Sequence, residues 1–200
     1  MRTRLHPQLR RFLTVAVVGT LAMALTACTA RGGGQLPPGL LFNGAANFGF
    51  SFSCEDSGGL NPRPGQLRIQ LSYADKGSDP IGSSFSIHGV ADTFDPVLES
   101  MLCAGQNPPT PPNQLIFLGR YRFTSSAPAG PLSTCETTTP GLCRFEVMVR
   151  DNDRNAVPST GDYFQIKLSR VTALTSEFLD PVTVPYTRGG RLSSGNITVD

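Results

Sequence analysis

The chain has 200 residues, with 17 lysines and arginines against 15 aspartates and glutamates, and a net charge of +2. Four of the basic residues, Arg2, Arg4, Arg10 and Arg11, lie in an N-terminal segment that has no acidic residue and is typical of a removable signal. Without that segment the net charge is −2, so the overall charge does not support nucleic-acid binding. The 21 glycines and 17 prolines favour a turn-rich β protein over a helical one.

The N-terminus predicts secretion. Residues 12–25 form an apolar segment that is too short to span a bilayer comfortably. The sequence Leu25-Thr26-Ala27-Cys28 follows and resembles the lipobox of bacterial lipoproteins, in which two small residues precede a cysteine that is acylated. We therefore predict a lipoprotein signal peptide over residues 1–27 and a lipidated Cys28. The mature protein would be extracytoplasmic and lipid-anchored to the cell membrane or the outer membrane. The alternative is ordinary secretory cleavage near Ala27, which leaves Cys28 as a plain thiol.

The next residues lack apolar periodicity and contain the triplet Gly32-Gly33-Gly34. We predict that residues 28–38 comprise the lipidated cysteine and a flexible tether. Residues 39–200 are then expected to form a single all-β domain.

Period-two alternation predicts strands throughout that domain. Residues 46–53 place Phe48, Phe50 and Phe52 on one face and small residues on the other. Similar patterns occur over residues 65–73, 84–91, 115–123, 144–151 and 162–169, and shorter ones over residues 182–186 and 196–199. About eight short strands separated by Gly, Pro, Asn and Asp predict an antiparallel β-sandwich. The one helix that we expect is a short one over residues 96–102.

Four cysteines follow Cys28: Cys54, Cys103, Cys135 and Cys143. An even number outside the cytoplasm predicts two disulfides, for which three connectivities are possible. We favour Cys135–Cys143, which closes a short loop, and by elimination Cys54–Cys103. The alternatives are four buried thiols or a metal site, and the absence of a Cys-x-x-Cys pair disfavours the metal.

The acidic segment over residues 151–162 is the best candidate for a ligand site. Its oxygen-bearing residues follow the rhythm of a calcium loop, with Asp151, Asp153, Asn155 and Asp162 as candidate ligands. Against calcium, Ala156 stands where an EF-hand loop has glycine, and Asp162 stands where it has a bidentate glutamate. The competing interpretation is a plain hairpin turn rich in Asp and Asn.

Several short glycine-containing motifs follow one another along the mature chain. They are Gly32-Gly33-Gly34, Ala46-Asn47-Phe48-Gly49-Phe50, Gly65-Gln66-Leu67, Arg150-Asp151-Asn152-Asp153, Gly161-Asp162-Tyr163-Phe164-Gln165-Ile166 and Gly195-Asn196-Ile197. Their order resembles the post-COAP type of extracellular β module found in bacterial secreted and surface proteins. The resemblance implies an extracytoplasmic β fold and no particular activity. Gln35 departs from it, because an aromatic residue is expected after the glycine triplet.

No catalytic residues are expected. The mature chain has one histidine, His88, which the alternation places on the outward face of its strand. Arg120, Arg122, Arg144 and Arg150 fall on outward faces of two strands and could meet anionic glycans or headgroups. We expect a lipid-anchored envelope protein with a non-catalytic binding or structural β module, braced by calcium if the acidic loop binds it. Its partners would be the membrane and an unknown envelope protein or glycan, without nucleic acid. The alternative is an envelope hydrolase acting on a glycan or ester.

Overall fold

The computed structural model describes residues 28–54, 67–77, 84–91, 113–125, 132, 143–152, 161–170 and 186–200. Within these residues the fold is all-β. The strands are β1 (Cys28–Leu36), β2 (Ala46–Cys54), β3 (Leu67–Asp75), β4 (Phe85–Ala91), β5 (Gln114–Phe123), β6 (Cys143–Arg150), β7 (Tyr163–Arg170), β8 (Tyr186–Arg191) and β9 (Ser194–Val199). The helix expected over residues 96–102 lies outside the described residues.

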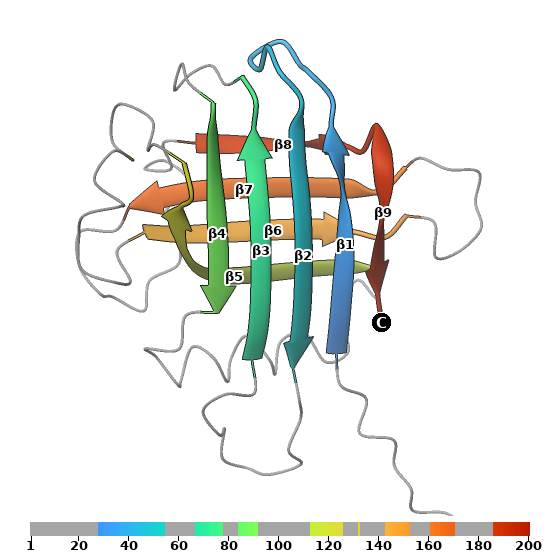
Figure 1. The fold of residues 1–200 in the computed structure, drawn as a ribbon. Helices are drawn as coiled ribbons and strands as arrows, with labels where there is room; N and C mark the ends of the chain where they lie inside the picture. The colour runs from blue at the N-terminus through green and yellow to red at the C-terminus, as the bar shows by residue number, and fades with distance from the viewer. Residues whose placement is uncertain are drawn as a thin grey trace, which may run out of the picture.

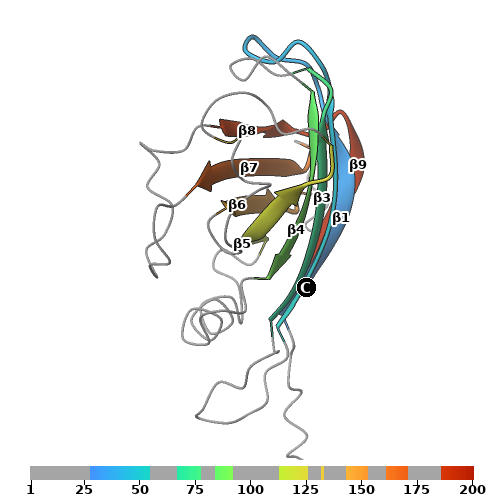
Figure 2. The same ribbon diagram turned by 60° about the vertical axis from the view of Figure 1, so that its left-hand side comes forward.

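All nine described strands belong to one antiparallel sheet in the order β8-β7-β6-β5-β4-β3-β2-β1-β9. The sheet curls strongly, so that β5 to β8 run across the back of β1 to β4 (Figure 1). The predicted antiparallel all-β fold is confirmed, while the described strands form one continuous curled sheet that is not clearly the predicted β-sandwich. β5 pairs with β4 on one edge and with β6 on the other, so the sheet continues around the bend as a half-barrel (Figure 2).

The core lies inside the curl, and the alternation predicted from the sequence places side chains there. On β2 the three phenylalanines Phe48, Phe50 and Phe52 are buried, while Ser51 is exposed. Phe48 stacks on Phe164 of β7 with ring centroids 3.8 Å apart, and Phe50 and Phe52 both contact Phe117 of β5. Aromatic contacts therefore join the two halves of the curled sheet across its interior.

Two inward-facing glycines make room for a bulky ring at the bend. A Cβ on Gly119 of β5 would lie 2.2 Å from the carbonyl oxygen of Val90 and 2.6 Å from the ring of Phe145. A Cβ on Gly89 of β4 would lie 2.6 Å from the same ring. Phe145 is fully buried, so the glycines allow the sheet to bend tightly around it.

The flexible tether predicted for residues 28–38 is not observed over residues 28–36, which form β1. This strand lies between β2 and β9. The glycine triplet hides the strand pattern because glycine contributes no side chain to the alternation. A Cβ on Gly34 would lie 2.5 Å from the carbonyl oxygen of Ser194, so glycine there lets β9 approach closely. The partner of Gly34 in the register, Gly195, has a φ of 109°, which only glycine adopts readily.

The remaining strand predictions are confirmed within a few residues, except near residue 186. Of the strand expected over residues 182–186, only Tyr186 lies within the described residues, where it begins β8, which runs to Arg191. The glycines and arginines of that segment gave no period-two apolar signal. In the structure Tyr186 and Arg188 face inward, while Thr187 and Gly189 face outward.

Candidate functional site

An open hollow of about 330 Å³ lies on the outer face of β2, β3 and β4. Its lining residues are Gly49, Phe50, Ser51, Gln70, Leu71, Ser72 and His88. The outward positions of the three strands supply Ser51, Gln70, Ser72 and His88, because side chains alternate between the two faces of a sheet. The hollow is therefore lined by neutral hydrogen-bonding side chains together with apolar surface from Phe50 and Leu71.

The strand register explains why the surface is hollow at this point. Gly49 of β2 lies opposite Ser72 of β3, and Ser72 lies opposite His88 of β4. Gly49 has no side chain, and the Ser72 hydroxyl turns toward it and donates to its carbonyl oxygen at 3.4 Å. The space that a larger residue at position 49 would fill is thus left open beside His88.

Arginines flank the hollow on both sides. Arg122 of β5 lies directly opposite His88, and Arg31 of β1 lies directly opposite Ser51. In the described part of the chain, neither arginine has an ion-pair partner. The outward positions of β1 to β5 also carry Arg68 and Arg120, and within these described strands they carry no acidic residue.

The arginines predicted on β5 and β6 do face the same side of the sheet. The two strands pair, and Arg120 lies directly opposite Arg144. Arg144 is buried, however, and Arg150 is engaged with Gln114 and with the ring of Tyr163. On β6, Glu146 pairs with Lys167, so the charge there is mixed. Of the four predicted arginines, Arg122 is the one next to the hollow.

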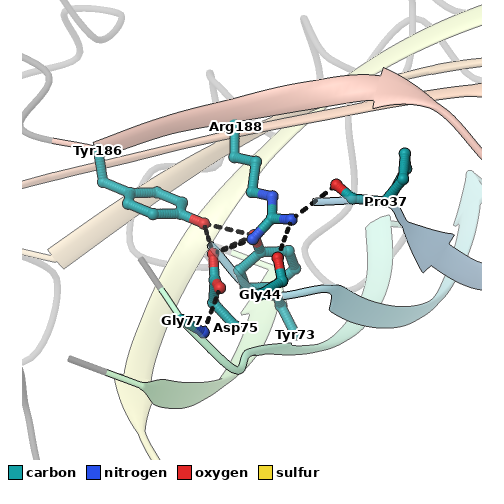
Figure 3. A network of polar contacts seen from close by, with 7 residues as sticks. All are labelled: Pro37, Gly44, Tyr73, Asp75, Gly77, Tyr186 and Arg188. Carbon is teal, nitrogen blue, oxygen red and sulfur yellow. Dashed lines mark hydrogen bonds and ion pairs between the residues drawn. The ribbon is translucent and has the colours of Figure 1, made fainter. Parts of the chain in front are cut away.

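A buried polar network joins β3 to β8 at the end of the sheet where β1 turns into β2 (Figure 3). Arg188 pairs with Asp75 at 2.7 Å, and both side chains are almost inaccessible to solvent. The Tyr186 hydroxyl donates to the same carboxylate at 2.5 Å, and the Tyr73 hydroxyl contacts both Tyr186 and Asp75. The backbone N–H of Gly77 donates to the other carboxylate oxygen at 3.1 Å.

The same arginine holds the connection between β1 and β2. Its guanidinium donates to the carbonyl oxygens of Pro37 at 3.0 Å and Gly44 at 2.6 Å, and it lies 4.6 Å from the centre of the Phe42 ring. Leu40 and Leu41, at the tip of this connection, are exposed. Arg188 therefore fixes both ends of an exposed apolar turn.

The environment of the network raises the pKa values of its two tyrosines and its arginine. Burial is the main cause that raises the pKa of Tyr73 and of Tyr186 above the ordinary value, and the Asp75 charge adds to it. Burial acts to lower the pKa of Arg188, but its hydrogen bonds and charge contact with Asp75 outweigh this and raise the pKa. The tyrosines thus remain protonated donors and the arginine remains charged. The hydrogen bonds and the ion pair of this network link β3, β8 and the β1–β2 connection.

Sequence reasoning missed this network, although a signal was present. The inward phase of β3 runs through Leu71 and Tyr73 to Asp75, and that of β8 runs from Tyr186 to Arg188. An acidic and a basic residue in core positions of two strands indicate a buried pair. The strand predictions ended at Tyr73 and at Tyr186, just before both charged residues.

The acidic segment has its two described carboxylates turned toward β9. Asp162 accepts the N–H of Ile197 at 2.6 Å and the N–H of Asn152 at 3.0 Å. Asp151 accepts the N–H of Val199 at 3.3 Å. Both side chains are buried, and they satisfy backbone donors on the edge of β9 that faces away from β1.

Calcium binding by this segment stays a prediction. Asp153 and Asn155, two of the four candidate ligands, lie outside the described residues. Within the described ones, no group of three or more His, Cys, Asp or Glu residues is placed to hold a metal ion. What the structure adds is a second role for Asp151 and Asp162, as caps for the edge of β9.

The cysteines are described only in part. Cys54 ends β2 and Cys143 begins β6, and each of them takes part in a disulfide bond. Cys103 and Cys135 lie outside the described residues, so the pairing Cys135–Cys143 with Cys54–Cys103 stays a prediction. Cys28 is the first residue of β1, and the predicted signal peptide over residues 1–27 lies outside the described residues.

Comparisons with protein-family models, with curated proteins and with solved structures found no match to this chain. The resemblance to the post-COAP type module therefore rests on the sequence motifs alone. Among the residues that the structure describes, no helix is long and apolar enough to cross a membrane. The class that the fold defines is an antiparallel, strongly curled single-sheet β protein.

Proposed function

We propose that this protein is a lipid-anchored component of the bacterial cell envelope whose β domain is a non-catalytic binding module. The observation that carries the binding role is the outer-face hollow, where Ser51, Gln70 and Ser72 converge beside His88. A concave surface with a few converging polar groups is what a binding site requires. The lipid anchor is supported by the lipobox sequence that ends at Cys28.

The chemistry of the hollow supports binding more than hydrolysis. A serine nucleophile needs a base within hydrogen-bond reach, and that base in turn needs an orienting group. The Ser72 hydroxyl donates to Gly49, and the cross-strand neighbours of His88 are Ser72 and Arg122. Within the described residues that line the hollow there is no carboxylate. The buried carboxylates Asp75, Asp151 and Asp162 are all engaged elsewhere.

The position of Cys28 has a consequence for the anchored protein. Cys28 is the first residue of β1, and Thr29 is hydrogen-bonded to Asp200 in both directions. A lipid on Cys28 would therefore hold the sheet directly against the membrane, with no spacer. The rise of a strand is about 3.3 Å per residue, so Arg31 would lie roughly 10 Å from the anchor.

The anchor is tested by metabolic labelling. The full chain, expressed in a bacterial host grown with labelled palmitate, should carry the label and fractionate with membranes. The variant Cys28→Ser should lose the label. An unlabelled wild type, or a labelled variant, would refute the lipid anchor.

The binding role is tested against its alternative, an envelope hydrolase acting on a glycan or ester. The full-length protein in detergent should release no product from p-nitrophenyl esters or from cell-wall glycan above the buffer rate. Turnover that disappears in both Ser72→Ala and His88→Ala would overturn the non-catalytic proposal and establish the hydrolase.

Calcium at the acidic loop is the second part of the proposal, with Asp151, Asp153, Asn155 and Asp162 as ligands. It is favoured by the oxygen-rich rhythm of the segment and by the position of two of the four candidate ligands, Asp151 and Asp162, against the same strand, β9. Calcium at a hundredfold excess over its dissociation constant should stabilise the protein by about 2.7 kcal/mol. The melting temperature should then fall on chelation, and Asp153→Ala should abolish the response. An unchanged melt would leave the two carboxylates as caps of β9.

A further inference from the structure

We propose that the outer-face hollow binds an extended acidic oligosaccharide, with carboxylate groups of the ligand held by Arg31 and Arg122. This inference rests on the proposed binding role and names its ligand class. It follows from the donors in the hollow, from the charge around it and from the distance between the two arginines.

The groups around the hollow are rich in hydrogen-bond donors. Gln70 offers an amide, Ser51 a hydroxyl and His88 an imidazole N–H, while Arg122 beside His88 offers a guanidinium. No carboxylate lines the hollow among the described residues, so an anionic ligand would meet no like charge there. An oxygen-rich anion is therefore the ligand that best matches this surface.

The surface around the hollow carries positive charge, like the arginines that flank it. The outward positions of β1 to β5 carry Arg31, Arg68, Arg120 and Arg122 without an acidic residue in these described strands. Arg31 and Arg122, which have no ion-pair partner in the described part of the chain, add positive charge to this face although the predicted mature chain has a net charge of −2. A local positive face on such a protein attracts anions to that face.

The separation of the two arginines selects an extended ligand over a small one. Arg31 is on β1 and Arg122 is on β5, which places three strands between them. Neighbouring strands lie about 4.8 Å apart, so the two arginines are roughly 19 Å apart across the strands. A single phosphate or carboxylate reaches one of them, whereas a chain of several acidic sugars reaches both and gains from binding at two points.

The experiment uses the full-length protein in detergent and calorimetric titration with defined probes. The probes are hexagalacturonate, galacturonate monomer, inorganic phosphate and neutral maltohexaose. Hexagalacturonate should bind, its affinity should fall as salt rises, and the monomer and phosphate should bind at least about tenfold more weakly. Maltohexaose should not bind. Equal binding of hexagalacturonate and maltohexaose, or no binding of either, would overturn the proposal.

Variants locate the site. Arg31→Gln and Arg122→Gln should each weaken hexagalacturonate binding about tenfold, as expected for the loss of one charge-assisted contact. Arg191→Gln is the matched control, because Arg191 is exposed on β8 and its substitution removes the same charge as the two hollow variants. Gly49→Val should block the hollow from the outward side, and its melting temperature shows whether it still folds. Equal loss in the control and in the two hollow variants would refute a defined site.

The membrane is the competing source of anionic groups. Vesicles of phosphatidylglycerol, offered to the Cys28→Ser variant so that no lipid anchor interferes, should bind no more tightly than vesicles of neutral phosphatidylcholine. Binding to the anionic vesicles that depends on Arg31 and Arg122, without binding to hexagalacturonate, would replace the glycan by a lipid headgroup. The palmitate-labelling and turnover experiments are independent of these outcomes, so failure of the ligand proposal is distinguishable from failure of the proposed function.

Discussion

Asp75 of β3 and Arg188 of β8 form a buried ion pair of 2.7 Å although four strands lie between β3 and β8 in the sheet order. Strands so distant in the sheet meet only because the sheet curls. The pair therefore links the two halves of the curl across its interior. It also fixes the β1–β2 connection through Pro37 and Gly44, as Figure 3 shows.

Removing one partner of this pair should strongly destabilise the protein. Asp75→Ala leaves the buried guanidinium of Arg188 without its counter-charge, and such changes cost about 3–5 kcal/mol of unfolding free energy. The double variant Asp75→Leu with Arg188→Met should be less costly than the single one, because it removes both charges. Urea denaturation measures the unfolding free energy of the single and the double variant. Lys167→Met, which breaks the partly buried pair with Glu146, is the control and should cost less than Asp75→Ala, because Glu146 keeps some access to solvent. Equal costs for Asp75→Ala and the control would contradict the role of the buried pair.

Alkaline pH should unfold the protein through its buried tyrosines. Burial raises the pKa of Tyr73, Tyr121 and Tyr186 above the ordinary value of 10. Above pH 10 these tyrosines ionise in the unfolded chain but stay protonated in the folded one. The unfolded state then binds fewer protons, so the unfolding free energy falls by about 1.4 kcal/mol per pH unit for each tyrosine. Below pH 10 their contribution is complete and constant.

The ultraviolet absorbance of tyrosinate and the circular dichroism of the sheet should therefore change together above pH 10. Tyr121→Phe removes one of the three groups and keeps the ring that packs against Phe123, so it should make the pH dependence shallower. Ionisation of all tyrosines well before the sheet unfolds would show that these side chains are accessible to solvent.

The strands were predictable wherever side chains alternate, as in β2 with its three phenylalanines. The glycine-rich β1 was not, because Gly32 and Gly34 are selected by the close approach of β9 and leave no apolar pattern. The bend at Gly119 was also hidden. A single sequence shows that strands exist, but whether they form two sheets or one depends on how β4, β5 and β6 pair over long range.

The candidate site was predictable only in its parts. The alternation correctly placed His88 and Arg122 on outward faces, but it could not show that they are cross-strand neighbours. The hollow depends on Gly49 lying opposite Ser72, which is a matter of strand register. Asp75 and Arg188 were missed because their contact joins residues that are 113 positions apart in the chain.

Asp162 and Asp151 should differ in their tolerance of the same substitution. Both oxygens of Asp162 accept backbone N–H groups, from Asn152 and Ile197. In Asp162→Asn the side-chain NH2 would therefore face one of these N–H donors and could not accept from it. We expect a cost of about 1–3 kcal/mol. Asp151 uses one oxygen, toward Val199, so Asp151→Asn can keep that bond and should cost less than about 1 kcal/mol. Hydrogen exchange should be faster at Ile197 in the first variant alone. Similar exchange at Ile197 in both variants would argue against the capping role.

A methyl group at the bend should be poorly tolerated. In Gly119→Ala the new Cβ would meet the carbonyl oxygen of Val90 at 2.2 Å and the Phe145 ring at 2.6 Å. Neither can move freely, because one is strand backbone and the other is fully buried, so we expect overpacking to cost about 1–3 kcal/mol. Gly190→Ala in β8 is the control, since its Cβ would come no closer than 3.9 Å to Leu36. Thermal melts should separate the two variants. If Gly119→Ala has the same melting temperature as Gly190→Ala, the bend is able to relax, and the fold does not depend on a glycine at position 119.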